Sequence, residues 1–169
     1  MTPVQLVFIL VAATTLGAAL MVVITRNLIH AALWLVLSLF GIAVMYVLLS
    51  APFLAVAQVV IYIGAIAILM IFAIMLTRRS TSEEGPALNA NWGWGALLGV
   101  VTLGGLVWVL SSWPGFFAAP APFPEGTDPL LTLGQALVSP NGYVLPFELA
   151  SVLLLAALIG AIVVAWDRR

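Results

Sequence analysis

The stretch from Gln58 to Leu76 reads QVVIYIGAIAILMIFAIML, and it decides the fold expected for this chain. It carries no charged side chain, and its only polar side chains are those of Gln58 and Tyr62. A helix needs about 20 apolar residues to cross ~30 Å of hydrocarbon. The stretch therefore predicts a transmembrane helix, and its one glycine, Gly64, predicts a weak point at Tyr62–Gly64.

The composition of the whole chain points to lipid as its solvent. Of the 169 residues, 64% are hydrophobic and 7% are charged. A water-soluble domain of this size cannot bury that much apolar surface. The net charge of -1 argues against a nucleic-acid partner, because nothing could neutralise a row of phosphates. Cysteine is absent, which excludes disulfides and thiolate metal sites.

The apolar runs predict an all-α polytopic membrane protein with five transmembrane helices. The predicted spans cover about residues 4–25, 31–49, 53–76, 93–112 and 145–166. The runs are continuous, whereas a β-barrel would show short alternating segments. We expect a single membrane domain over residues 1–169, in which the first run is a retained span and not a signal peptide.

Two short polar turns, a short polar loop at 78–91 and one long loop separate these spans. The turns are Arg26–Asn27 and Ser50–Pro52, and Pro52 suits the first turn of a helix, where its missing N–H costs little. The loop at 113–144 is rich in proline, and within it Leu130–Val138 could form a short helix on the membrane surface.

The positions of the arginines predict the orientation. With five spans, all five arginines fall on one side of the membrane: Arg26, Arg78, Arg79, Arg168 and Arg169. The opposite side carries only Glu125 and Asp128. The positive-inside rule then places the N-terminus outside and the C-terminus in the cytoplasm, with the loop 113–144 external.

Glu148 is the only carboxylate inside a predicted span. An ionisable group in a bilayer is a functional candidate, here as part of a proton path. The structural alternative is favoured, because Pro146 looks like the first helical residue. Glu148 would then lie in the first turn, where free N–H groups and the helix dipole stabilise a carboxylate.

Gln58, Tyr62 and Gly64 form the other candidate site. Gln58 and Tyr62 are four residues apart, so one helical face carries both polar groups and could line a water-filled gap. Alternatively, the Tyr62 hydroxyl bonds a nearby backbone carbonyl, and Gly64 only allows close helix packing. The β-branched run 59–61 followed by a glycine favours a kink or a π-bulge.

The remaining candidates point less clearly to chemistry. Gly95 and Gly99 form a GxxxG pattern, which predicts a helix–helix contact. His30 could relay protons, but a single interfacial histidine is more often only hydrated, and no second histidine completes a metal site. No carboxylate or lysine lies at mid-membrane depth, and no nucleophile–base pair exists. We therefore expect a subunit of a larger machine.

Three motifs together resemble subunit J of bacterial respiratory complex I. The segment 57–66, continued by 72–76, resembles the third helix of that family. The segment Arg26–Ala32 is similar to its first turn, and Leu145–Leu155 is similar to the start of its fifth helix. The five spans and the chain length also fit, and the resemblance covers about residue 20 to the C-terminus.

The resemblance implies a multi-pass membrane-arm subunit of the proton-translocating NADH:quinone oxidoreductase of the bacterial cytoplasmic membrane. NADH, FMN, Fe–S clusters and quinone would lie on partner subunits, and this chain would carry no catalytic residue. Its partners would include the quinone-site subunit, a small carboxylate-bearing subunit and lipid. Tyr62, Gly64 and Ala65 would be the hinge that opens a water path toward those carboxylates.

Other classes of function remain open at the level of sequence. One is the equivalent subunit of a related cation/proton antiporter or membrane-bound hydrogenase. Another is a passive scaffold subunit with no part in coupling. A small multidrug exporter would need a mid-span carboxylate, which this chain lacks.

Overall fold

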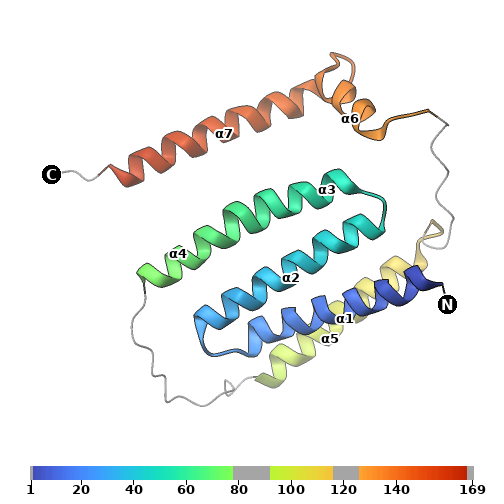
Figure 1. The fold of residues 1–169 in the computed structure, drawn as a ribbon, viewed down its shortest axis with the longest axis vertical. Coiled ribbons are helices and arrows are strands. Elements are labelled where there is room, and N and C mark those ends of the chain that lie inside the picture. The colour runs from blue at the N-terminus through green and yellow to red at the C-terminus, as the bar shows by residue number, and fades with distance from the viewer. Residues whose placement is uncertain (1, 78–91, 116–125, 167–169) are drawn as a thin grey trace. The chain divides into compact units, whose positions relative to one another are not determined.

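A computed structural model describes residues 2–77, 92–115 and 126–166, which contain helices and no strand. Figure 1 shows the helices in chain order. They are α1 (Pro3–Ile24), α2 (Leu28–Leu48), α3 (Pro52–Ala57), the π-helix η1 (Gln58–Ala67), α4 (Ile68–Leu76), α5 (Trp92–Ser112), α6 (Pro129–Val138) and α7 (Val144–Ala165).

In the described part of the chain, five helices are long and apolar enough to cross a membrane, as predicted. The third of them joins α3, η1 and α4 into one helix of 25 residues, Pro52–Leu76. The second begins at Leu28, earlier than predicted, because Asn27 caps it. The Asn27 side chain accepts from the N–H of Ile29 at 3.0 Å and of His30 at 3.4 Å, which satisfies two free donors of the helix.

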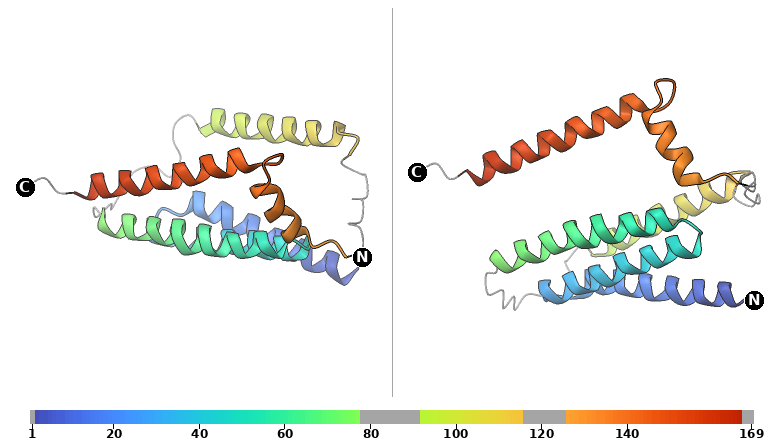
Figure 2. Two further views of the ribbon diagram at one scale, coloured as in Figure 1. Left: turned by 90° about the horizontal axis from the view of Figure 1, so that it is seen from above. Right: turned by 45° about the horizontal axis from the view of Figure 1, so that its top comes forward.

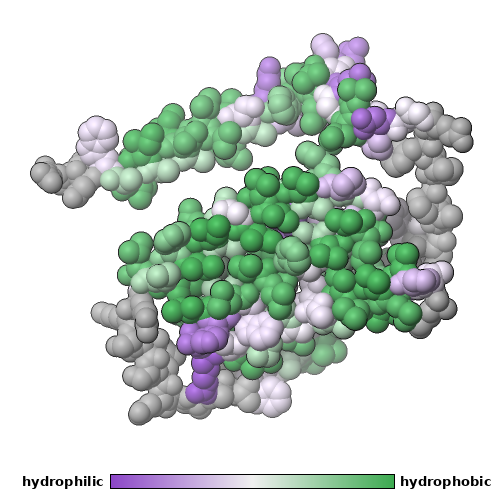
Figure 3. Space-filling view, in the orientation of Figure 1, coloured by the Kyte–Doolittle hydropathy of each residue, from purple (hydrophilic) through white to green (hydrophobic). Residues whose placement is uncertain are grey.

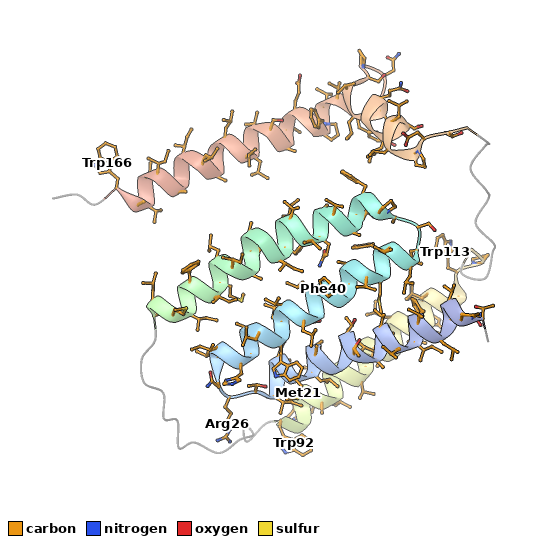
Figure 4. The ribbon with its side chains drawn as sticks, viewed as in Figure 1. Met21, Arg26, Phe40, Trp92, Trp113 and Trp166 are labelled. Atoms are coloured by element: carbon orange, nitrogen blue, oxygen red, sulfur yellow. The ribbon has the colours of Figure 1, made fainter. Side chains whose placement is uncertain are left out.

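The tight connections also match the sequence. Figure 4 shows Arg26 at the turn between α1 and α2, with its side chain directed away from both helices. After α2, Ser50 adopts a left-handed φ of 58° and Ala51 N–H donates to Tyr46 O at 2.9 Å, which closes the helix end. Pro52 then starts α3.

The first compact unit, Met1–Ala87, holds α1, α2 and the third membrane helix. In Figures 1 and 2, α2 lies between the other two, and it contacts both. The buried apolar side chains of the described residues are all alanines: Ala18, Ala32, Ala43, Ala55 and Ala67. Small side chains let helix backbones approach closely in a membrane.

The second unit, Leu88–Arg169, is described here by its parts. None of the residues of α5 is buried. In α6, the Asp128 side chain accepts from Leu130 N at 2.9 Å, and Tyr143 N donates to Ala136 O at 2.8 Å, which ties the end of α6 to the start of α7. The predicted short helix is confirmed, whereas its place on the membrane surface stays a prediction.

Apolar side chains dominate the outer surface of the helices, as Figure 3 shows for α1 to α4. A surface of this kind suits lipid or partner helices and not water. The predicted orientation stays a prediction, because four of its residues, Arg78, Arg79, Arg168 and Arg169, and also Glu125, lie outside the described residues.

Candidate functional site in the third membrane helix

The middle of the third membrane helix is a π-helix of ten residues, Gln58–Ala67. A π-helix pairs each carbonyl with the N–H five residues on, where an α-helix uses four, and most examples are single turns at functional sites. At its start Gln58 N–H donates to Ala55 O and Leu54 O, and after its end Ile68 N–H donates to Ala65 O. The sequence favoured a kink or bulge near Tyr62–Gly64, and the π-helix extends to both sides of that point.

Gln58, the first residue of η1, is almost fully buried, with 6% of its surface exposed. Its Nε2 donates to the backbone carbonyl of Leu39 in α2 at 3.4 Å. Tyr62 is 49% exposed, and no hydrogen bond joins the two side chains within the described residues. The two polar groups predicted to share a stripe therefore differ: Gln58 faces α2, and Tyr62 is open to lipid, water or a partner.

Gly64 and Ala65 are exposed, next to Tyr62. A Cβ placed on Gly64 would have one neighbour within 4 Å, the carbonyl oxygen of Val59 at 3.4 Å. Val59 is five residues earlier, which is the partner that π-helix geometry assigns to Gly64. Within the described part of the chain, the missing side chain of Gly64 therefore borders its own helix turn and not a second helix.

The prediction that Glu148 lies in the first turn of its helix is wrong. The helix α7 begins at Val144, two residues before Pro146, and has no acidic residue in its first turn. Glu148 follows Val144 by four residues, which is about 6 Å along the helix axis at 1.5 Å per residue. Its side chain is exposed. Glu148 therefore makes no hydrogen bond to the free N–H groups at the helix start, and its role in a proton path stays a prediction.

The other candidates gain no neighbours in the structure. A Cβ placed on Gly95 or Gly99 meets nothing within 4 Å, so their contact with another helix stays a prediction. His30 is exposed at the start of α2. Among residues 2–77, 92–115 and 126–166, no group of three His, Cys, Asp or Glu side chains could hold a metal ion.

Sequence reasoning missed two buried polar residues, Thr15 and Ser38. The Ser38 hydroxyl donates to the Thr15 carbonyl at 3.4 Å and joins α2 to α1. The residue types alone could have indicated this contact, because small and hydroxyl-bearing residues in membrane helices are enriched where helices meet.

Comparison with known proteins decides the family. The family model for NADH-ubiquinone/plastoquinone oxidoreductase chain 6 matches residues 18–164. The chain belongs to this family. The match includes the whole third membrane helix, with η1, and nearly all of α7.

Relatives with known names cover most of the chain. It is similar to the NAD(P)H-quinone oxidoreductase chain 6 of Synechocystis sp., with 38% identity over 94% of this chain and 78% of that protein. It is 38% identical to the F(420)H(2) dehydrogenase subunit J of Methanosarcina mazei, over 94% of this chain and 89% of the other. It is 34% identical to the NADH-quinone oxidoreductase subunit J of Rhodobacter capsulatus, over 100% of this chain and 85% of that protein.

The family is that of the subunit J, or chain 6, membrane subunit of respiratory complex I, whose cofactors lie on other subunits. The five apolar helices and the bacterial relatives make this chain a multi-pass protein of the cytoplasmic membrane. The relatives are subunits of an enzyme complex, the NADH- or NAD(P)H-quinone oxidoreductase.

Proposed function

We propose that this chain is a membrane-arm subunit of a proton-translocating NADH:quinone oxidoreductase, and that its third membrane helix couples quinone reduction to proton movement. In this role the chain carries no catalytic residue. The observation that supports the proposal best is the ten-residue π-helix, Gln58–Ala67, at the segment where the sequence resembles the family.

A π-helix suits a moving part because the same residues can also form an α-helix. A π-helix holds more residues in each turn than the 3.6 of an α-helix, so the two forms rotate by different angles per residue. Converting the π segment to α would therefore turn the helix on one side of Gln58–Ala67 relative to the other side. Such a change redirects side chains without breaking the span.

The residues that would move are Tyr62, Gly64 and Ala65. They are exposed in this chain, and the only carboxylate in a described span, Glu148, lies in another helix. The third helix has no acid to carry a proton itself. It would open or close a water path for carboxylates on a neighbouring small subunit, close to the subunit that binds quinone.

Substitution of Gly64 tests the proposal. A Cβ at Gly64 makes an ordinary contact with the Val59 carbonyl oxygen at 3.4 Å, so the substitution acts through the backbone, whose geometry a β-branched side chain restricts. A difference of about 1 kcal/mol between the π and α forms changes their equilibrium about fivefold. We expect Gly64→Val to assemble but to lose NADH:quinone turnover and proton pumping, and Gly64→Ala to be milder. Both activities are measured in membranes and normalised to assembled complex.

Ala73→Val is the matched control, because Ala73 is exposed on the same helix but lies in α4, outside η1. It adds a branched side chain without touching the π segment and should retain most of the activity. Normal activity per assembled complex in Gly64→Val would show that the third helix only packs, and the scaffold alternative would then hold.

A second candidate is the equivalent subunit of a complex with another electron donor. The relative in Methanosarcina mazei is named for F(420)H(2), and it is as similar to this chain as the Synechocystis relative. Purification in mild detergent distinguishes the two, because the electron-input subunits that remain with this chain identify the donor. The proposed role of the third helix is the same in both cases.

A further inference from the structure

Three polar side chains are buried among the described residues, and they lie in three successive membrane helices. They are Thr15 in α1, Ser38 in α2 and Gln58 at the start of η1, with exposed fractions of 8%, 8% and 6%. We call these three residues the polar seam. Burying a polar group in an apolar surrounding is unfavourable unless it is hydrogen-bonded, so their partners matter.

Hydrogen bonds of the polar seam join α1 and η1 to two adjacent residues of α2, Ser38 and Leu39. Ser38 Oγ donates to the Thr15 carbonyl in α1 at 3.4 Å. Gln58 Nε2 donates to the carbonyl of Leu39, the residue after Ser38, also at 3.4 Å. A helix carbonyl has a second lone pair free for such a donor. Gln58 is therefore the point at which η1 is held to α2 by a directional bond.

The two ends of η1 are held differently. On the amino-terminal side, Ala55 of α3 is buried and Gln58 is hydrogen-bonded to α2. On the carboxyl-terminal side, Ala67 is buried, but its methyl group has no donor or acceptor to set a rotation, and α4 has no buried residue. Within the described residues, a directional hydrogen bond holds the amino-terminal end of η1 to α2, whereas the carboxyl-terminal end is held by apolar packing alone.

We propose that Gln58 is a positioning residue that holds the amino-terminal end of η1 against α2, so that a change between π and α geometry turns the Tyr62–Ala65 segment. This inference rests on the proposed function of the third helix. Without the Gln58 bond, both ends would share the rotation, and the Tyr62–Ala65 face would turn through a smaller angle. A smaller turn, unlike the blocked turn expected of Gly64→Val, would let quinone reduction on other subunits continue with fewer protons moved.

The test is Gln58→Met in the complete complex. Methionine is similar in length to glutamine but cannot donate to the Leu39 carbonyl. We expect the number of protons moved per electron to fall at least twofold in the assembled complex, while NADH:quinone turnover persists. A purely structural role would lower the amount of complex and its turnover together, and would leave that ratio unchanged.

Ser38→Ala is the control within the polar seam, because it removes the bond between α1 and α2 and leaves Gln58 and Leu39 in place. We expect a lower yield of complex and an unchanged proton-to-electron ratio. If Gln58→Met keeps the normal ratio while Gly64→Val loses activity, the role of Gln58 is refuted and the proposed function stands. If both variants behave normally, the proposed function fails as well.

A second variant covers the case in which Gln58→Met does not assemble. Gln58→Asn keeps the amide but is one methylene shorter, so it cannot reach the Leu39 carbonyl with the same geometry. We expect it to assemble and to show the lowered ratio. Failure of both variants to assemble would assign Gln58 to assembly alone and overturn its positioning role.

Discussion

Glu148 is the residue whose interpretation changes most between sequence and structure. Its exposed carboxylate lies in the second turn of α7, about 6 Å beyond the helix start at Val144. A charged side chain within a membrane segment is costly, by about 2.5–3.5 kcal/mol at the bilayer centre, and such residues usually mark ion or proton paths. A role of Glu148 in a proton path is a prediction that substitution can test.

The prediction at this scale is that Glu148→Gln assembles but lowers proton pumping several-fold per assembled complex. The amide keeps the size of the carboxylate and cannot take up or release a proton. Pumping and NADH:quinone turnover are measured together in membranes. Asp128→Asn is the control, because Asp128 caps α6 outside the spans and asparagine caps equally well. Normal pumping in Glu148→Gln would show that Glu148 has a structural role and no part in proton transfer.

At the scale of elements, α1 and α2 come close together where Thr15 lies beside Gly41. A Cβ placed on Gly41 would overlap Thr15 Oγ1 and lie 3.0 Å from Thr15 Cβ. Thr15 cannot give way freely, because its hydroxyl donates to the Val11 carbonyl at 2.7 Å and it is buried. The pairing of the two helices therefore depends on the absence of a side chain at Gly41.

We predict that Gly41→Ala weakens the α1–α2 pair by about 1–3 kcal/mol through overpacking. The yield and thermal stability of the assembled complex report the loss. Adding Thr15→Ala removes the worst overlap and should restore part of the yield. Gly17→Ala, in the partner helix α1, should be tolerated because a Cβ there meets nothing within 4 Å. Equal yields of Gly41→Ala and Gly17→Ala would contradict the close contact.

At the scale of the whole molecule, the described helices bury few of their own side chains. The buried apolar residues are alanines, and no large side chain is fully buried among the described residues. An isolated fold of this kind has little hydrophobic core of its own. The apolar surface of each described helix therefore suits lipid or partner helices and not water.

The orientation of the whole chain gives the last prediction. Because the arginines fall on one side of five spans, a reporter after Arg169 should be cytoplasmic, and one inserted between Pro114 and Pro124 should be external. A third reporter, in the Arg26–Asn27 turn, should agree with the one after Arg169. Each reporter is an enzyme that is active on only one side of the membrane, so its activity shows on which side its position lies. The reverse pattern of activities would show that the topology is inverted.

The sequence by itself determined the class of protein, the five spans and the turns between them. Each of these follows from a local property: the length of an apolar run, a capping residue such as Asn27, or a proline at a helix start such as Pro52. It also favoured an irregularity near Gly64, because a β-branched run and a glycine strain an α-helix there.

Only the tertiary structure decided the length of η1, the burial of Gln58 and the close contact of Gly41 with Thr15. Each backbone N–H of this segment can bond the carbonyl four residues earlier, as in an α-helix, or five residues earlier, as in a π-helix. The choice between α and π therefore depends on what the helix packs against. Gln58 and Tyr62 look alike in sequence as polar residues of one span. They differ because α2 offers the Leu39 carbonyl to Gln58 and lies away from Tyr62, which is a property of the fold and not of either residue.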